Sequence, residues 1–347
     1  MFSALFTINT LKRLVAFLCC IVFSACYWAE TEDNPDYLPM DDSVYPYAGL
    51  PRIVIETEDF AGLRDRETEF PSKLQIYGEK SPQSEVLELT VRGRGNSSFK
   101  MPKYGMKLEF KDKVELFGMP KSRDWALIAN YGDKTHLRNY MMTRLSEWLG
   151  AKYTPRMQFV ELYLNRKYMG LYLLSETIKV AKNRVHIEEN DTTFLVEKED
   201  VKKYDPPYVI TDHKNIYHIR SPKDPPDESL ELLQNHLNNF EHFLMNHYLY
   251  EDEDILNWID LEDYLLYYWV QEYSKNEDGN YARSVFFTWT KGEPIHFGPL
   301  WDFDLAFGNA SRTENQNPED WYISEYRLNY YIVKNHVVDS AIAVYWN

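Results

Sequence analysis

Two aspartates stand two residues apart in the segment Trp301-Asp302-Phe303-Asp304, which follows an apolar run ending at Leu300. Carboxylates at the end of a buried strand are costly to desolvate without a counter-ion. Hard divalent cations prefer oxygen ligands of this kind. We therefore predict that Asp302 and Asp304 bind a divalent metal ion, the alternative being ordinary turn or cap residues.

A third carboxylate, Asp278, lies earlier in the chain, in the loop Lys275-Asn276-Glu277-Asp278-Gly279. A predicted hairpin, with strands from Ser284 to Thr290 and from Ile295 to Leu300, separates this loop from Asp302. Phosphoryl-transfer enzymes use one carboxylate to orient the attacking hydroxyl and another to hold metal. Asp278 is accordingly the candidate that orients a substrate hydroxyl or accepts its proton, although a turn residue would fit its position equally well.

The candidate phosphate-binding residues lie in the first half of the chain. Gly93, Arg94 and Gly95 form a short glycine-rich segment whose backbone amides would be able to approach an anion closely. Lys103 and Lys107 follow at a spacing that would place an ammonium group beside phosphate oxygens. Taken alone, the same residues also fit a β-turn with exposed arginines and two exposed lysines.

Charge is unevenly distributed along the 347 residues, whose formal net charge is -16. The excess of acid argues against general nucleic-acid binding, because such affinity comes mainly from neutralising phosphates with Lys and Arg. Residues 90–140 nevertheless carry a net charge of +6, and residues 249–340 carry -12. This separation fits either two oppositely charged docking surfaces or a basic phosphate-binding part opposite an acidic metal-binding part.

The amino terminus is predicted to be a targeting segment, not part of the fold. Lys12 and Arg13 precede an apolar stretch and then small residues, which is typical of a secretory signal over residues 1–25. The sequence Phe23-Ser24-Ala25-Cys26 resembles a bacterial lipobox, although its Phe departs from the usual Leu, so plain secretion remains an alternative. Lipidated Cys26 would attach the chain to a membrane outside the cytoplasm. The segment 26–48, which is rich in acidic and polar residues, would form a flexible tether.

The cysteines exclude a zinc finger and a disulfide scaffold, because all three lie within the first 26 residues. Periodicity predicts a mixed α+β architecture. A helix is expected from Asp133 to Gly150, and two more from Asp227 to about Tyr248 and from Asp260 to about Tyr273. Strands are expected at 53–56, 73–77, 86–92, 106–110, 158–164, 168–174 and 194–197, and a loop-rich stretch between the proline pairs at 206–207 and 225–226.

Five segments occur in an order that resembles the CotH family of secreted atypical kinases, named for spore coat protein H. They are Arg94-Gly95-Asn96-Ser97-Ser98; Trp125 to Asn130 with Asp133 and Arg138-Asn139; Gly170 to Glu176; Lys275 to Gly279; and Gly298 to Asp304. The resemblance covers roughly residues 50 to 310, so we expect a CotH-like domain at 49–310. Residues 311–347 are expected to be an atypical, shortened end.

The resemblance implies a divergent two-lobed protein-kinase-like α+β fold, ATP with Mg²⁺ or Mn²⁺ as cofactors, and phosphorylation of protein serines, including autophosphorylation. It assigns Asp278 as the catalytic aspartate and Asp302 as the metal-binding one, and it adds Glu176 to the residues that bind the cofactor. Kinase-like loops place an Asn about five residues after the catalytic Asp, where this chain leaves Asn280 or Ser284 as the substitute. We expect a monomer. The alternative function is that of a non-catalytic surface lipoprotein that binds protein or carbohydrate.

Overall fold

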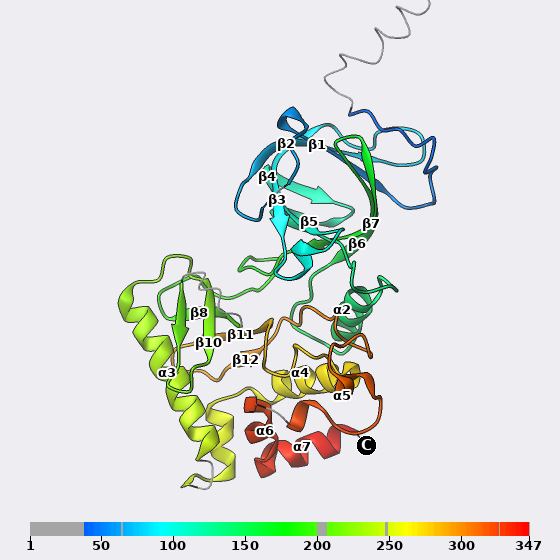
Figure 1. The fold of residues 1–347 in the computed structure, drawn as a ribbon. Coiled ribbons are helices and arrows are strands. Elements are labelled where there is room, and N and C mark those ends of the chain that lie inside the picture. Colours follow the sequence, from blue (N-terminus) through cyan, green and yellow to red (C-terminus); the bar gives the residue numbers. More distant parts are fainter. Residues whose placement is uncertain (1–37, 64, 200–206, 247–248, 326, 347) are drawn as a thin grey trace, which may run out of the picture. The chain divides into compact units, whose positions relative to one another are not determined.

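The computed structural model describes residues 38–346, apart from 64, 200–206, 247–248 and 326. Its first half is a closed β-barrel of seven strands in the order β1-β2-β3-β4-β5-β7-β6 (Figure 1). The strands are β1 (Arg52–Thr57), β2 (Phe70–Tyr77), β3 (Leu87–Arg94), β4 (Gly105–Leu116), β5 (Met119–Ile128), β6 (Met157–Leu164) and β7 (Lys167–Glu176).

The barrel is closed by β1 and β6, which pair in parallel with Ile53 opposite Leu162. All other pairings of β1 are antiparallel, to β2. Ile53, Val54 and Ile55 are all fully buried, so β1 is covered on both faces. Leu38 lies in a cluster with Val54 and accepts a hydrogen bond from the Tyr77 hydroxyl at 2.8 Å, so the first described residues already pack against strands.

A second sheet of five strands has the order β12-β11-β8-β10-β9 and is antiparallel throughout. Its large core combines sheet residues with helices α3 and α4, and Figure 1 shows α3 beside β8 and β10. The strands are β8 (Thr193–Lys198), β9 (Tyr208–Ile210), β10 (Ile216–Ser221), β11 (Val285–Thr290) and β12 (His296–Phe297). The described residues also form the helical elements α2 (Arg138–Trp148), α3 (Asp227–Met245), η4 (Asp252–Asn257), α4 (Leu261–Ser274), α5 (Thr313–Gln316), α6 (Arg327–Val333) and α7 (His336–Trp346), besides the short turns η1 (Glu58–Phe60), η2 (Ser98–Lys100) and η5 (Ile323–Glu325).

The prediction of a divergent two-lobed protein-kinase-like α+β fold is wrong, because a closed seven-stranded barrel and a second sheet dominate the structure. Alternating apolar residues predict single strands, but closure depends on pairing between residues more than a hundred positions apart. The sequence pattern also missed β5 entirely. The structure has β9 and β10 in the stretch between the two proline pairs, which we expected to be loop-rich.

The three predicted helices are confirmed as α2, α3 and α4; α2 and α3 are shorter than expected, and α4 is shifted by one residue. Residues 311–347, expected to be atypical, contain α6 and α7, whose Leu328, Ile332 and Val338 belong to the large core. None of the described helices is long and apolar enough to cross a lipid bilayer. The predicted signal segment 1–25 and Cys26 lie outside the described residues. Of the predicted tether 26–48, only residues from Leu38 onward are described.

Contacts divide the chain into two compact units. The first contains residues up to Gly93 together with 108–112 and 159–172, and the second contains 94–107, 113–158 and 173–347. Among the candidate site residues that the structure describes, all except Gly93 belong to the second unit.

Candidate active site

The loop that carries Asp278 begins where α4 ends. Lys275 caps this helix in the left-handed conformation, with φ of +44°, and the Ser274 carbonyl accepts a hydrogen bond from Phe307 N–H at 2.7 Å. The Asp278 carbonyl accepts from the N–H groups of Ala282 and Arg283, which closes the loop into a tight turn. The Asp278 carboxylate lies 3.6 Å from the Arg283 guanidinium.

Asp302 and Asp304 are held by hydrogen bonds to the backbone that surrounds them. Asp302 adopts a left-handed φ of +66°, a strained value for a residue other than glycine. Its carbonyl accepts from Asn276 Nδ2 at 3.0 Å, and the next N–H, that of Phe303, donates to Asn139 Oδ1 at 2.8 Å. The strained segment is therefore held by two buried amide side chains.

Arg138 and Ser284 complete the support of this segment. Arg138, the first residue of α2, donates from Nε to the Ala306 carbonyl at 2.8 Å and pairs with the buried Asp133 carboxylate. Ser284 Oγ donates to Asp302 Oδ2 at 3.4 Å. Helix α2 and the loop before β11 thus both help to position the two aspartates.

The three predicted carboxylates act on one another electrostatically. Burial, with the nearby Asp302 charge, raises the pKa of Asp278 to about 6. Burial and the charge of Asp304 raise the pKa of Asp302 to about 8, against the opposing effect of Arg94. Burial and the Asp278 charge also raise the pKa of Asp304. The structure therefore brings Asp278, Asp302 and Asp304 together, as a cluster whose negative charge is incompletely balanced.

The donor set of this cluster fits a hard divalent cation. Asp302 and Asp304 supply carboxylate oxygens, and burial without sufficient positive charge destabilises their ionised forms. In the same region, the Oδ1 atoms of Asn276 and Asn280 are buried and have no hydrogen-bond partner. Amide oxygens are ordinary ligands of Mg²⁺ and related ions. Asn280, one of the two expected substitutes for the second-metal Asn, thus has an oxygen to offer. The other, Ser284, donates its hydroxyl proton to Asp302 and keeps its oxygen lone pairs.

The glycine-rich segment places Arg94 near the aspartates. Gly95 has a φ of +114°, and a Cβ at this position would lie 2.2 Å from Ser98 Oγ, so only glycine fits without strain. The Arg94 guanidinium lies 5.3 Å from the centre of the Trp301 ring, and its charge lowers the pKa of Asp302. Gly93 is a buried residue inside β3.

The predicted lysines lie beside other groups. Lys103 is partly buried, which lowers its pKa to about 8, and its charge helps to lower the pKa of His136. Lys107, on β4, acts on Asp124, a carboxylate that pairs with Lys179. Lys103 and Lys107 thus act electrostatically on His136 and on Asp124, respectively.

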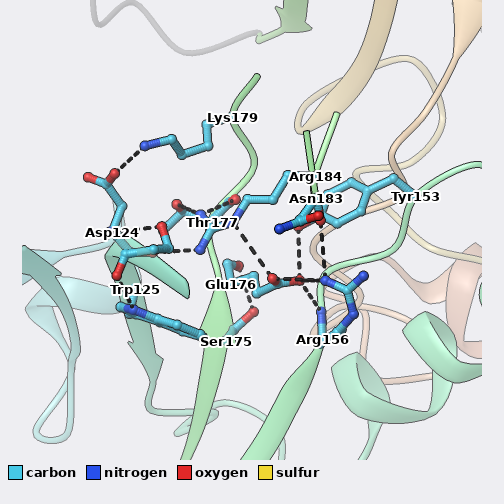
Figure 2. Close-up of polar contacts among 11 residues, drawn as sticks. Asp124, Trp125, Tyr153, Arg156, Ser175, Glu176, Thr177, Lys179, Asn183 and Arg184 are labelled. Carbon is cyan, nitrogen blue, oxygen red and sulfur yellow. Dashed lines mark hydrogen bonds and ion pairs between the residues drawn. The ribbon is translucent and has the colours of Figure 1, made fainter. Parts of the chain in front are cut away.

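Glu176 lies in a separate buried polar cluster (Figure 2). Its fully buried carboxylate accepts hydrogen bonds from the backbone N–H and from Nη1 of Arg156, all at 3.0 Å, and from the Tyr153 hydroxyl at 3.3 Å. Arg184 Nε lies 3.7 Å away. The described contacts of Glu176 are thus with two arginines and a tyrosine, none of which we predicted as a site residue.

Arg184 links this cluster to β5. Its Nη1 donates to the carbonyl and hydroxyl oxygens of Thr177, its Nη2 donates to the Asp124 carbonyl at 2.8 Å, and its guanidinium lies 5.6 Å from the centre of the Trp125 ring. Figure 2 shows Arg156 and Arg184 reaching Glu176 from different directions. No local sequence pattern indicated these arginines, because their partners come from other strands.

A further group able to hold a metal consists of Asp260, Asp263 and His296, whose ligand atoms lie within 4.8 Å of one another. Asp263 Oδ2 lies 2.7 Å from His296 Nδ1, but it also lies 2.6 Å from the Lys152 ammonium group. Lys152 already supplies a positive charge to these carboxylates. The sequence prediction missed this group because the histidines show no regular metal-binding spacing.

Residues 91–343 match the family model described as CotH kinase protein. The match begins in β3 and continues through α6 into α7, so it includes the carboxyl-terminal segment that we expected to be atypical. No curated protein matches the chain.

Proposed function

The chain belongs to the CotH kinase protein family, and from this premise we propose that it transfers the γ-phosphoryl group of ATP to serine hydroxyls of proteins, itself included. Membership of the family supports a kinase-like function. We propose in addition that ATP is the donor, that serine is the acceptor, and that individual residues have the roles described below.

The observation that carries the proposal is the cluster of Asp278, Asp302 and Asp304 with Arg94 beside it. Asp302 and Asp304 would hold Mg²⁺ or Mn²⁺, with the buried amide oxygen of Asn280 as a further ligand. A divalent cation in this position supplies neutralisation of the negative charge on the phosphate oxygens. Arg94 and the amides of the Gly95 turn would bind the remaining phosphate oxygens.

Asp278 would orient the serine hydroxyl and accept its proton. With a pKa of about 6, this carboxylate is mostly ionised at pH 7, as a proton acceptor must be, yet it is more basic than an ordinary aspartate. Its position 3.6 Å from Arg283 limits the side-chain orientations open to it.

We also propose that the protein works outside the cytoplasm, attached to a bacterial membrane through acylated Cys26, as a monomer without a nucleic-acid partner. The support is the order of basic, apolar and small residues before Cys26 and the acidic net charge.

The proposed activity is tested by transfer of labelled γ-phosphate from ATP to the protein and to a serine-rich acceptor, with Mg²⁺ or Mn²⁺. We expect metal-dependent labelling of the wild type and a loss of at least about a hundredfold in Asp278→Asn and Asp302→Asn. Asp224→Asn changes an exposed aspartate outside the cluster and serves as the matched control.

Labelling that survives in both cluster variants would show that other residues catalyse the phosphoryl transfer. A folded wild type that neither labels nor binds ATP would favour the alternative, a non-catalytic surface protein.

A further inference from the structure

A pocket of about 450 Å³ lies between α3, η4 and the turn that follows β11. It shares no residue with the candidate active site. Four of its lining residues are aromatic and two are acidic: Phe243, Tyr250, Trp258, Trp289, Asp254 and Glu293.

The aromatic rings pack on one another and so form firm walls. Phe243 lies 4.9 Å from Tyr250 and 5.6 Å from Trp258, measured between ring centres. On another wall, His236 stacks on Trp289 at 3.8 Å with the two planes 12° apart. Aromatic faces are electron-rich and attract cations, most strongly when the cation is shielded from water.

The charge of the lining is negative. Asp254 and Glu293 supply two carboxylates, and among the described residues that line the pocket there is no Lys or Arg. His236 is the only other titratable base, and burial lowers its pKa to about 4, so it is neutral at pH 7. A neutral ligand that filled the pocket would displace water from the two carboxylates and would bring no positive charge to pair with them. Desolvating an unpaired carboxylate costs free energy.

We propose that this pocket binds an organic cation through a guanidinium group. A guanidinium group is planar, stacks on aromatic rings, sheds water more readily than an ammonium group and pairs with carboxylates. The pocket offers both kinds of partner on neighbouring elements. The ligand is either a free guanidinium compound or an arginine side chain of another protein, and the proposal is independent of phosphoryl transfer.

The test is calorimetric titration of the full-length protein, in a maltoside detergent and physiological salt, with butylguanidinium and with its neutral isostere butylurea. We expect butylguanidinium to bind at least about ten times more tightly than butylurea. The peptide acetyl-Gly-Arg-Gly-amide distinguishes the two sources. Binding at least as tight as that of butylguanidinium assigns the site to an arginine side chain, and weaker binding assigns it to a free guanidinium compound.

Glu293→Gln removes one carboxylate from an exposed position and should weaken butylguanidinium binding at least about threefold. Glu253→Gln is the matched control, because Glu253 is an exposed acid on η4 that does not line the pocket. Tyr250→Ala removes part of an aromatic wall from a side chain that is 42% exposed, so the fold should tolerate it, and it should weaken binding as well.

Three results would overturn the proposal. They are equal binding of butylurea and butylguanidinium, binding of glucose but not of butylguanidinium, and no binding of any probe. Unchanged affinity in both Glu293→Gln and Tyr250→Ala, each with wild-type thermal unfolding, would also place the cation outside this pocket.

Discussion

Asn139 connects α2 to the segment that carries the two aspartates. Its Oδ1 accepts from Phe303 N–H at 2.8 Å, and its Nδ2 donates to Asn130 Oδ1 at 3.0 Å. The side chain is buried, so neither partner would readily find water in its absence. Asn139 therefore shares with Asn276 the task of fixing the peptide between Asp302 and Phe303.

We expect Asn139→Ala to lower the free energy of unfolding by about 1–3 kcal/mol, because it leaves two buried polar groups unpaired. Phosphoryl transfer should fall by about tenfold or more, since small displacements of catalytic groups are costly. Urea unfolding and the labelling assay measure the two effects. Asn238→Ala, which removes one exposed hydrogen bond to Asp212 N–H, is the control. Activity within twofold of wild type would show that Asn139 does not position the aspartates.

His236 makes stability depend on pH. Burial lowers its pKa from 6.5 to about 4, so the folded protein binds this proton only at lower pH than the unfolded chain does. Its contribution to stability is therefore present above pH 6.5 and is lost as the pH falls toward 4.

His236→Phe keeps an aromatic ring against Trp289 but removes the titration. We expect the wild type to lose up to about 2–3 kcal/mol of stability through this group between pH 6.5 and 4, and the variant to lack that part of the decline. Urea unfolding across this range measures the difference, with the exposed His213→Phe as the control. Parallel stability curves for His236→Phe and wild type would contradict the assignment.

At the scale of elements, β7 is joined to its neighbours by the Glu176 cluster. Trp125 of β5 lies opposite Glu176 in the ladder, and Arg156, just before β6, binds the same carboxylate. Arg184 is almost fully buried, and the charges of Glu176 and Asp124 both favour its ionised form. The residue that we predicted to bind cofactor thus holds strand ends together.

Glu176→Ala should lower the free energy of unfolding by about 3–5 kcal/mol, because it takes from the buried Arg184 guanidinium the carboxylate 3.7 Å away. Glu56→Ala breaks the more exposed pair with Arg166 and should cost about 0–1 kcal/mol. Chemical unfolding of both variants gives the comparison. Equal losses at the two positions would mean that the Glu176 cluster contributes no more than a surface ion pair.

At the scale of the whole molecule, the basic and acidic segments of the sequence meet in one compact unit. Residues 94–107 and 113–158 belong to the same unit as 173–347, and Arg94 acts on Asp302 within it. One basic residue of the first segment, Arg94, therefore offsets part of the negative charge of the aspartate cluster.

Attachment of the whole molecule depends on Cys26 in our proposal. We expect Cys26→Ser to abolish incorporation of labelled fatty acid and to move the protein from the detergent phase to the aqueous phase in a phase-separation assay, because acyl chains supply the binding to membrane. Cys20→Ser, inside the predicted signal segment, should leave both unchanged. A Cys26→Ser protein that still incorporates fatty acid would exclude this anchor.

The sequence by itself determined the family and the acidic residues of the candidate site, because Asp278, Asp302 and Asp304 stand in short segments whose order along the chain is distinctive. It also predicted most strands and three helices, since local periodicity reports which face of an element is buried. Only the tertiary structure decided that the strands close into a barrel, because the pairing of β1 with β6 joins distant residues. It likewise decided the partners of Glu176: Arg156, Arg184 and Tyr153 reach that carboxylate from other parts of the chain, and no local pattern encodes such contacts.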